Sequence, residues 1–96
     1  MAFSVDGKRV TVAGAARSGI AAAELLVKRG ARVTLSDTRH EIEDVESLRG
    51  QGVTLELGGH QAATFRHADL IVLSPGVPAE QPVIANARLA GVPVIG

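Results

Sequence analysis

Two kinds of hydrophobic pattern alternate along this chain. Short apolar runs rich in β-branched residues predict strands over residues 9–13, 32–36, 53–57, 70–73 and 93–95. Between them, apolar residues recur at helical spacing and predict helices over residues 18–29, 42–50, 61–67 and 82–90. Glycines follow the first, second and last of these helices and support the ends assigned to them.

Strands that alternate with helices indicate parallel pairing through right-handed crossovers. The expected fold is therefore an α/β, Rossmann-like, doubly wound parallel sheet of five strands in the order 3-2-1-4-5, with helices on both faces. We expect residues 1–96 to form one domain. Since the sequence stops directly after the fifth predicted strand, we also expect that domain to be one part of a longer protein.

Composition narrows the classes of function. A chain of 96 residues that is 46% hydrophobic and 21% charged is typical of a soluble globular domain. Ten basic and ten acidic residues cancel, and Phe3 and Phe65 are the only aromatic residues, so a nucleic-acid-binding surface is not expected. The chain has no cysteine, no apolar run long enough to span a membrane and no secretory signal, which together favour a cytoplasmic location.

The first predicted strand leads into the turn G-A-A-R-S-G over residues 14–19, a variant of the dinucleotide-binding fingerprint. Gly14 suits a tight turn, Gly19 lets the helix approach the strand, and Ala16 keeps the middle position small. The helix N-terminus beyond would favour a diphosphate, to which Ser18 either adds a hydroxyl donor or instead caps its own helix. A turn with a purely structural role is the alternative.

Asp37 follows the second predicted strand, 18 residues after Gly19. In dinucleotide-binding domains a carboxylate at this distance accepts hydrogen bonds from a ribose. The alternative is a helix cap or an Asx-turn residue that opens the loop of residues 38–40.

The fourth predicted strand ends in the loop Ser74-Pro75-Gly76-Val77-Pro78. Two prolines stiffen this loop, and Gly76 allows close approach by a flat group. In the expected strand order the loop faces the glycine turn across the ligand crevice. A rigid turn into the last helix is the equally plain alternative.

Metal binding and catalysis find little support in the sequence. The three histidines, His40, His60 and His67, lack the i, i+4 spacing and the cysteine neighbours of a metal site. No P-loop for ATP is present, and no nucleophile and base stand in a catalytic pattern. We therefore expect neither a metal site nor catalytic residues in this chain.

Three runs together resemble the N-terminal domain of the Mur ligases, in the branch that adds D-glutamate. They are V-A-G-A-A-R-S-G over residues 12–19, V-T-L-S-D-T-R over residues 33–39 and A-D-L-I-V-L-S-P-G-V-P over residues 68–78. The segment Gly58-Gly59-His60 and the closing residues 90–96 are also similar to that branch. The resemblance covers essentially the whole chain, and the run over residues 68–78 discriminates best.

The resemblance implies a three-domain cytoplasmic enzyme of peptidoglycan synthesis. Its first domain holds the UDP part of UDP-N-acetylmuramoyl-L-alanine, its middle domain binds ATP and magnesium, and its last domain receives the amino acid. The complete enzyme would activate the substrate carboxylate as an acyl phosphate and join it to D-glutamate. This chain corresponds to the first domain alone, so no cofactor is expected to bind to it and the ATPase and C-terminal domains would be its partners.

The resemblance also implies a binding site. The turn before the first helix would contact the diphosphate through backbone N–H groups and the Ser18 hydroxyl. Asp37 and Thr38 would meet the uracil with Arg39 nearby, and Gly76 would lie on the other side of the base. The expected UDP-binding residues are Gly14, Ala16, Arg17, Ser18, Gly19, Asp37, Thr38, Arg39, Ser74 and Gly76.

Two positions depart from the family pattern. The family usually has glycine where this chain has Ala16, which would narrow the phosphate turn. It often has an aliphatic residue at the position of Arg17, where a guanidinium would stack on the base or pair with the diphosphate.

A second hypothesis is an NAD-binding domain from a dehydrogenase or from a nucleotide-sensing regulator. Both hypotheses use Asp37, because uracil N3–H and ribose hydroxyls are all donors to a carboxylate. Ala16, the pair Thr38-Arg39 and the stiff loop after the fourth strand stand against NAD. The residues alone leave the two hypotheses nearly even, and the resemblance favours the substrate-binding module.

Overall fold

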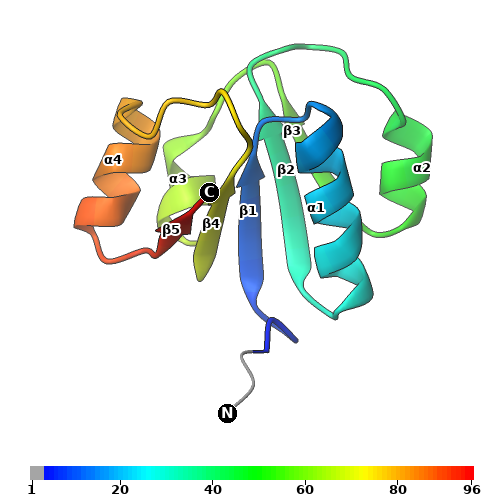
Figure 1. The fold of residues 1–96 in the computed structure, drawn as a ribbon, viewed down its shortest axis with the longest axis horizontal. Coiled ribbons are helices and arrows are strands. Elements are labelled where there is room, and N and C mark those ends of the chain that lie inside the picture. The colour runs from blue at the N-terminus through cyan, green and yellow to red at the C-terminus, as the bar shows by residue number, and fades with distance from the viewer. Residues whose placement is uncertain (1–3) are drawn as a thin grey trace.

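A parallel sheet of five strands forms the middle of the molecule (Figure 1). The structure is a computed structural model that describes residues 4–96, so Phe3 lies outside the described residues. The strands are β1 (Arg9–Ala13), β2 (Arg32–Asp37), β3 (Thr54–Leu57), β4 (Leu70–Leu73) and β5 (Val94–Ile95). Their order is β3-β2-β1-β4-β5 and every neighbouring pair is parallel. The predicted fold class and strand order are confirmed.

The helices that connect the strands are α1 (Arg17–Lys28), α2 (Val45–Gly50), α3 (Ala62–Arg66) and α4 (Pro82–Leu89). Figure 1 shows α1 and α2 beside β2 and β3, and α3 and α4 beside β4 and β5. The prediction that the second helix begins at residue 42 is wrong. Asp44 has a left-handed backbone with a φ of 62°, which prevents a helix from continuing through it. Ile42 nevertheless packs against the core from the preceding loop.

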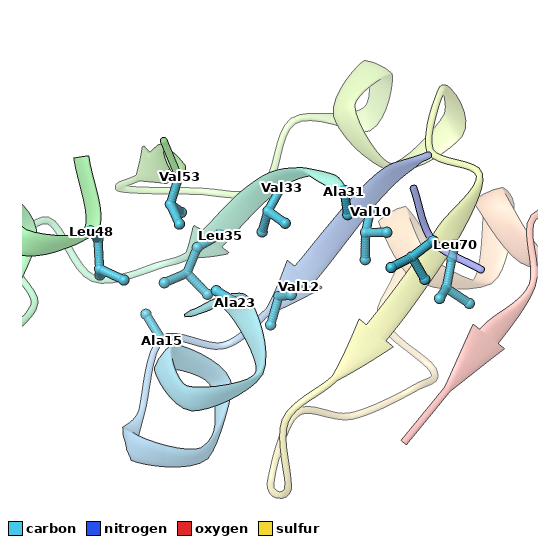
Figure 2. Packing of buried hydrophobic residues seen from close by; sticks show 11 residues of the cluster. Val10, Val12, Ala15, Ala23, Ala31, Val33, Leu35, Leu48, Val53 and Leu70 are labelled. Carbon is cyan, nitrogen blue, oxygen red and sulfur yellow. The ribbon is translucent and has the colours of Figure 1, made fainter. Parts of the chain in front are cut away.

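Two apolar clusters lie on the two faces of the sheet. Because alternate strand residues point to opposite faces, Val10 and Val12 face α1 and α2, whereas Ala13 faces α3 and α4. Figure 2 shows the first cluster, in which Ala23 of α1 and Leu48 of α2 lie against the strands. The second cluster is centred on Phe65, Ile71 and Ile84, all fully buried. Helices cover both faces, as predicted.

The strand register brings three loops to one edge of the sheet (Figure 1). Ala13, the last residue of β1, pairs with Ser36 on one side and with Leu73 on the other. The chain therefore leaves β1, β2 and β4 at neighbouring points, where the strand order reverses. This is the position at which open α/β sheets bind their ligands. None of the helices in residues 4–96 has the length and apolar character needed to cross a membrane.

Candidate functional site

The turn after β1 requires both of its glycines. Gly14 has a φ of 100°, in the left-handed region, and its amide donates to the Ser36 carbonyl at 2.8 Å. A Cβ on Gly14 would lie 2.7 Å from Val77 Cγ2. A Cβ on Gly19 would lie 1.8 Å from the Gly14 carbonyl oxygen and 2.4 Å from Ser74 Oγ. The structure thus confirms the tight turn at Gly14 and the close approach of helix and strand at Gly19.

The N-terminus of α1 presents backbone amides beside this turn. Ala16 is the N-cap residue, and the first helical hydrogen bond runs from the Ile20 amide to the Ala16 carbonyl at 3.0 Å. The amides of residues 17–19 therefore have no partner within the helix. The backbone of Ala16 is extended, with a φ of −75°, so alanine fits here without strain. Arg17 and Ser18 are exposed.

Ser18 does not cap its own helix. It is the second residue of α1, and the N-cap position belongs to Ala16, whose side chain makes no capping hydrogen bond. Of the two roles considered for the Ser18 hydroxyl, the capping role is wrong. Its role as a donor to a phosphate remains a prediction.

Asp37, at the end of β2, receives four hydrogen bonds on its carboxylate. Oδ2 accepts from the buried Ala15 amide at 2.7 Å and from Arg39 Nη2 at 3.1 Å. Oδ1 accepts from the Arg39 amide at 2.8 Å and from Arg39 Nε at 3.1 Å. The bond from the Arg39 amide is the Asx turn that the sequence offered as an alternative, and the bond from Ala15 ties β2 to the glycine turn.

The charge state of Asp37 follows from these contacts. Burial raises the pKa of Asp37, but the hydrogen bonds from the Arg39 side chain and from the Ala15 and Arg39 amides, with the positive charge of Arg39, outweigh it. The net result lowers this pKa from its ordinary value of 3.8 to about 2. Asp37 is therefore a carboxylate at neutral pH. Its partner is more open to solvent, since the side chain of Arg39 is 55% exposed and that of Asp37 is 10% exposed.

The loop after β4 holds the glycine turn from the other side. Ser74 is buried, and its hydroxyl donates to the Gly14 carbonyl at 2.7 Å. Its amide donates to the Ala13 carbonyl at 2.9 Å. Two residues on, Gly76 is exposed with a φ of 90°, and a Cβ there would meet no atom within 4 Å. Ser74 thus joins the two loops, while Gly76 leaves open surface beside them.

A cleft of about 590 Å³ lies between α1 and the loop that follows β2. Ala16, Arg17 and Arg39 line it together with Glu24 and Glu43. The structure brings these three predicted residues together. The other seven are not part of this lining: Gly14, Ser18, Gly19, Asp37, Thr38, Ser74 and Gly76. A larger hollow of about 800 Å³, at the amino ends of the strands, contains none of the predicted site residues.

Sequence reasoning missed the loop after β3 as part of this site. The Gly58 amide donates to the Arg39 carbonyl at 2.8 Å, and the Gly59 amide donates to the Asp37 carbonyl at 3.2 Å. A Cβ on Gly58 would lie 2.7 Å from His40 Nδ1, so this backbone is in close contact with the loop after β2. The signal that could have identified it is the Gly58-Gly59-His60 segment, noted for its resemblance but given no role.

Comparison with known proteins shows to which family the chain belongs. The family model described as "Mur ligase MurD-like, N-terminal domain" matches residues 8–96. The chain is 50% identical, over 98% of its own length, to the UDP-N-acetylmuramoylalanine--D-glutamate ligase of Koribacter versatilis. It is 53% identical, over 96% of its length, to the enzyme of the same name from Anaeromyxobacter dehalogenans. It spans about a fifth of the length of these curated relatives, 21% and 20% respectively.

Solved structures agree with the fold. A pseudomurein peptide ligase type C from Methanothermus fervidus superimposes with a TM-score of 0.81 at 25% identity, covering 94% of this chain and 19% of that one. Dipicolinate synthase, A chain, from Bacillus subtilis superimposes with a TM-score of 0.71 at 15% identity, covering 91% of this chain and 28% of that one. The second likeness is one of fold alone. With a glycine turn held between two loops and a family match over residues 8–96, the chain belongs to the Mur ligase MurD-like N-terminal domain family.

Proposed function

We propose that this chain binds the UDP moiety of UDP-N-acetylmuramoyl-L-alanine. In this proposal it is the substrate-holding domain of a cytoplasmic ligase that adds D-glutamate in peptidoglycan synthesis. The observation that carries the proposal is the joining of three loops at one edge of the sheet. Asp37 bonds to Ala15 from one side and Ser74 bonds to Gly14 from the other, so the three segments that carry the family resemblance are joined at the carboxyl ends of the strands.

The diphosphate would bind at the start of α1. Three successive amides there lack helical partners, and the partial positive charge of a helix N-terminus favours an anion. Arg17 and Arg39 supply full positive charges in the adjacent cleft, whose lining also includes the acidic residues Glu24, Glu43 and Asp44. Ser18 is exposed beside these amides and has a hydroxyl to donate.

The contacts of Asp37 define how a ligand would reach its carboxylate. Its carboxylate has about four acceptor sites, and four donors already occupy them. A ligand must therefore displace a donor, and the exposed Arg39 side chain is easier to displace than the buried Ala15 amide. The Arg39 side chain holds one site on each oxygen through Nε and Nη2, so its displacement would free two sites, enough for uracil N3–H or for two ribose hydroxyls. A displaced Arg39 would remain close enough to donate to a uracil carbonyl or a phosphate.

We propose that the ATP and magnesium of the ligase reaction bind outside this domain. Residues 4–96 contain no group of three or more His, Cys, Asp or Glu side chains that could hold a metal ion. We assign this domain the binding and orientation of the UDP end, and we place the chemistry of amide-bond formation in the other domains of the ligase.

The proposal is tested by following the backbone amides of the 15N-labelled chain by NMR during titrations. UDP-N-acetylmuramoyl-L-alanine, UDP, ADP and NAD are added separately, so that UDP and ADP differ only in the nucleoside. We expect saturable shifts at residues 17–19, 38–39 and 76 with the two uridine ligands. Equal or stronger shifts with NAD or ADP would overturn the proposal, and so would the absence of shifts with all four ligands.

A matched pair of variants localises the base. Thr38→Val removes a hydroxyl from the expected uracil site with little change in shape, and we expect it to weaken UDP binding several-fold. Thr54→Val makes the same change on an exposed residue at the start of β3, away from the site, and should leave the affinity unchanged. Equal affinities for both variants would remove Thr38 from the site.

A further inference from the structure

A cluster of polar side chains lies where β2, β3 and α3 meet, and it contains none of the predicted site residues. Its members are Ser36, Glu56, His60 and Thr64, and we refer to it as the Ser36 cluster. Ser36 Oγ lies 2.5 Å from Glu56 Oε2 and 2.6 Å from His60 Nδ1. Thr64 Oγ1 donates to Glu56 Oε1 at 2.5 Å. Ser36 and Glu56 are register partners on β2 and β3, so the sheet itself brings them together.

The cluster is not a nucleophilic triad, although it contains a serine, a histidine and an acid. Ser36 is fully buried, with an exposed fraction of 0%, and no substrate can reach its hydroxyl. It also stands between the other two groups, whereas a triad has the histidine in the middle. The arrangement is one that holds parts of the chain together.

The hydrogens in the cluster can be placed by counting donors. Ser36 has one hydroxyl hydrogen, and both Glu56 oxygens act as acceptors, since Oε1 accepts from Thr64 Oγ1 and Oε2 accepts from the Gln61 amide at 3.3 Å. The contact between Ser36 and Glu56 therefore uses the Ser36 hydrogen. The short contact between Ser36 and His60 then needs a hydrogen on His60 Nδ1. The geometry thus assigns His60 an Nδ1–H that donates to Ser36 Oγ.

The orientation of the His60 ring is fixed from a second direction. The ring meets Phe65 of α3 edge to face, with centroids 5.3 Å apart and an interplanar angle of 79°. Phe65 is fully buried in the second apolar cluster. His60 is therefore held between a polar contact to β2 and an apolar contact to α3, and its place in the loop after β3 is closely defined.

The backbone around the cluster is the backbone of the candidate site. The Ser36 carbonyl accepts from the Gly14 amide, the hydrogen bond that shapes the glycine turn. Gly58 and Gly59 directly precede His60, and their amides donate to the carbonyls of Arg39 and Asp37 respectively. The His60–Ser36 contact thus fixes the loop after β3 to β2 at the point where both support the loop of residues 37–39.

We propose that His60 is a positioning residue for the UDP site, which it reaches through Ser36 and through the backbone of residues 37–39. The proposal rests on the proposed function for the identity of the ligand, while its structural part stands on the contacts alone. Side chains that bind a ligand need support from neighbours that lock their geometry. His60 provides that support to a loop in which Thr38 and Arg39 are exposed.

Three variants distinguish the contribution of the His60 hydrogen bond from that of the His60 ring. His60→Phe keeps a flat ring against Phe65 but removes the donor. His60→Asn gives up the ring but places an amide N–H near the position of Nδ1. His67→Phe is the matched control, since His67 is exposed at the end of α3 and lies outside the Ser36 cluster. We expect His60→Phe to weaken UDP binding about tenfold, His60→Asn to restore binding to within a few-fold, and His67→Phe to have no effect.

Two measurements without ligand complete the test. The ring nitrogens of His60 in the unmodified chain should show a protonated Nδ1 in 15N spectra. Hydrogen exchange of the Gly14, Gly58 and Gly59 amides should be faster in His60→Phe than in the unmodified chain or in His67→Phe. A His60 ring with its hydrogen only on Nε2, or unchanged exchange and affinity in His60→Phe, would overturn the proposal. If the unmodified chain fails to bind UDP, the proposed function fails, and the ring and exchange measurements still decide whether His60 positions the loop.

Discussion

The glycine turn is held by two side chains from opposite sides, and the two differ in kind. Asp37, from β2, is a carboxylate that accepts a hydrogen bond from the Ala15 amide at 2.7 Å. Ser74, from the loop after β4, is a neutral hydroxyl that donates to the Gly14 carbonyl, also at 2.7 Å. Successive residues of one turn thus have their N–H and C=O satisfied by neighbouring loops.

Because one side chain is neutral and the other is charged, Ser74 and Asp37 respond differently to ligand and to pH. Ser74 makes a buried hydrogen bond between a hydroxyl and a carbonyl, and neither group titrates within the ordinary pH range. Asp37 makes charge-assisted hydrogen bonds, which are roughly twice as strong as neutral ones. It also forms an ion pair with the exposed Arg39. We infer that the β4 side of the turn is a fixed support, whereas the β2 side is the one that a ligand or a proton can alter.

The largest effect is expected at Gly19, where the glycine turn and Ser74 meet α1. The substitution Gly19→Ala would place a Cβ 1.8 Å from the Gly14 carbonyl oxygen and 2.4 Å from Ser74 Oγ, so the backbone itself must move. Overpacking typically costs about 1 to 3 kcal/mol, and because the clash here is with backbone we expect a cost of about 3 kcal/mol. We expect the free energy of unfolding, measured in urea, to fall by that amount or the chain to remain unfolded.

Gly50→Ala is the matched control for this substitution. Gly50 lies at the end of α2, and a Cβ there would meet no atom within 4 Å. Alanine favours a helix over glycine, so we expect a gain of up to about 1 kcal/mol or no change. Similar losses in the two variants would mean that the contact at Gly19 does not determine the effect.

The next largest effect is expected at Asp37, and it should depend on pH. Because the folded state lowers the pKa of Asp37 from 3.8 to about 2, its ionisation stabilises the fold above pH 4. That stabilisation is lost as the pH falls from about 4 towards 2, where the carboxylate takes up a proton. We expect Asp37→Asn to reduce the free energy of unfolding by about 2 kcal/mol at pH 7, the range of a lost charged hydrogen bond.

The measurement for Asp37 is a series of urea titrations of both proteins between pH 7 and pH 2. The difference in free energy of unfolding between the unmodified chain and Asp37→Asn should shrink as the pH approaches 2. A difference that stays constant over this range would show that the charge of Asp37 contributes nothing to the support of the turn.

The strands and the turn between β1 and α1 could be predicted from the sequence because both depend on local signals. Apolar runs of four or five residues between helical stretches define parallel strands, and the spacing of Gly14 and Gly19 defines the turn between β1 and α1. The start of α2 could not be predicted in the same way. The apolar spacing of Ile42 and Val45 is helical, but the left-handed backbone of Asp44 separates them.

The contacts that support the site were out of reach for a different reason. Whether Asp37 faces a ligand or makes an Asx turn depends on where Ala15 and Arg39 lie, and sequence spacing does not determine those positions. The Ser36 cluster joins side chains that are 20 and 24 residues apart along the chain. Ser36 and Glu56 become neighbours only through the register of β2 and β3, which no local pattern defines.

The smallest effect is expected on the β4 side of the turn. Ser74→Ala removes one neutral hydrogen bond and leaves the Gly14 carbonyl without its hydroxyl partner, a loss of about 1 kcal/mol. Since neither group titrates, this loss in the free energy of unfolding should be the same at pH 7 and at pH 3, in contrast to Asp37→Asn. A loss that varies with pH would show that the two sides of the turn are coupled, and that the carboxylate of Asp37 acts through Ser74 as well as through Ala15.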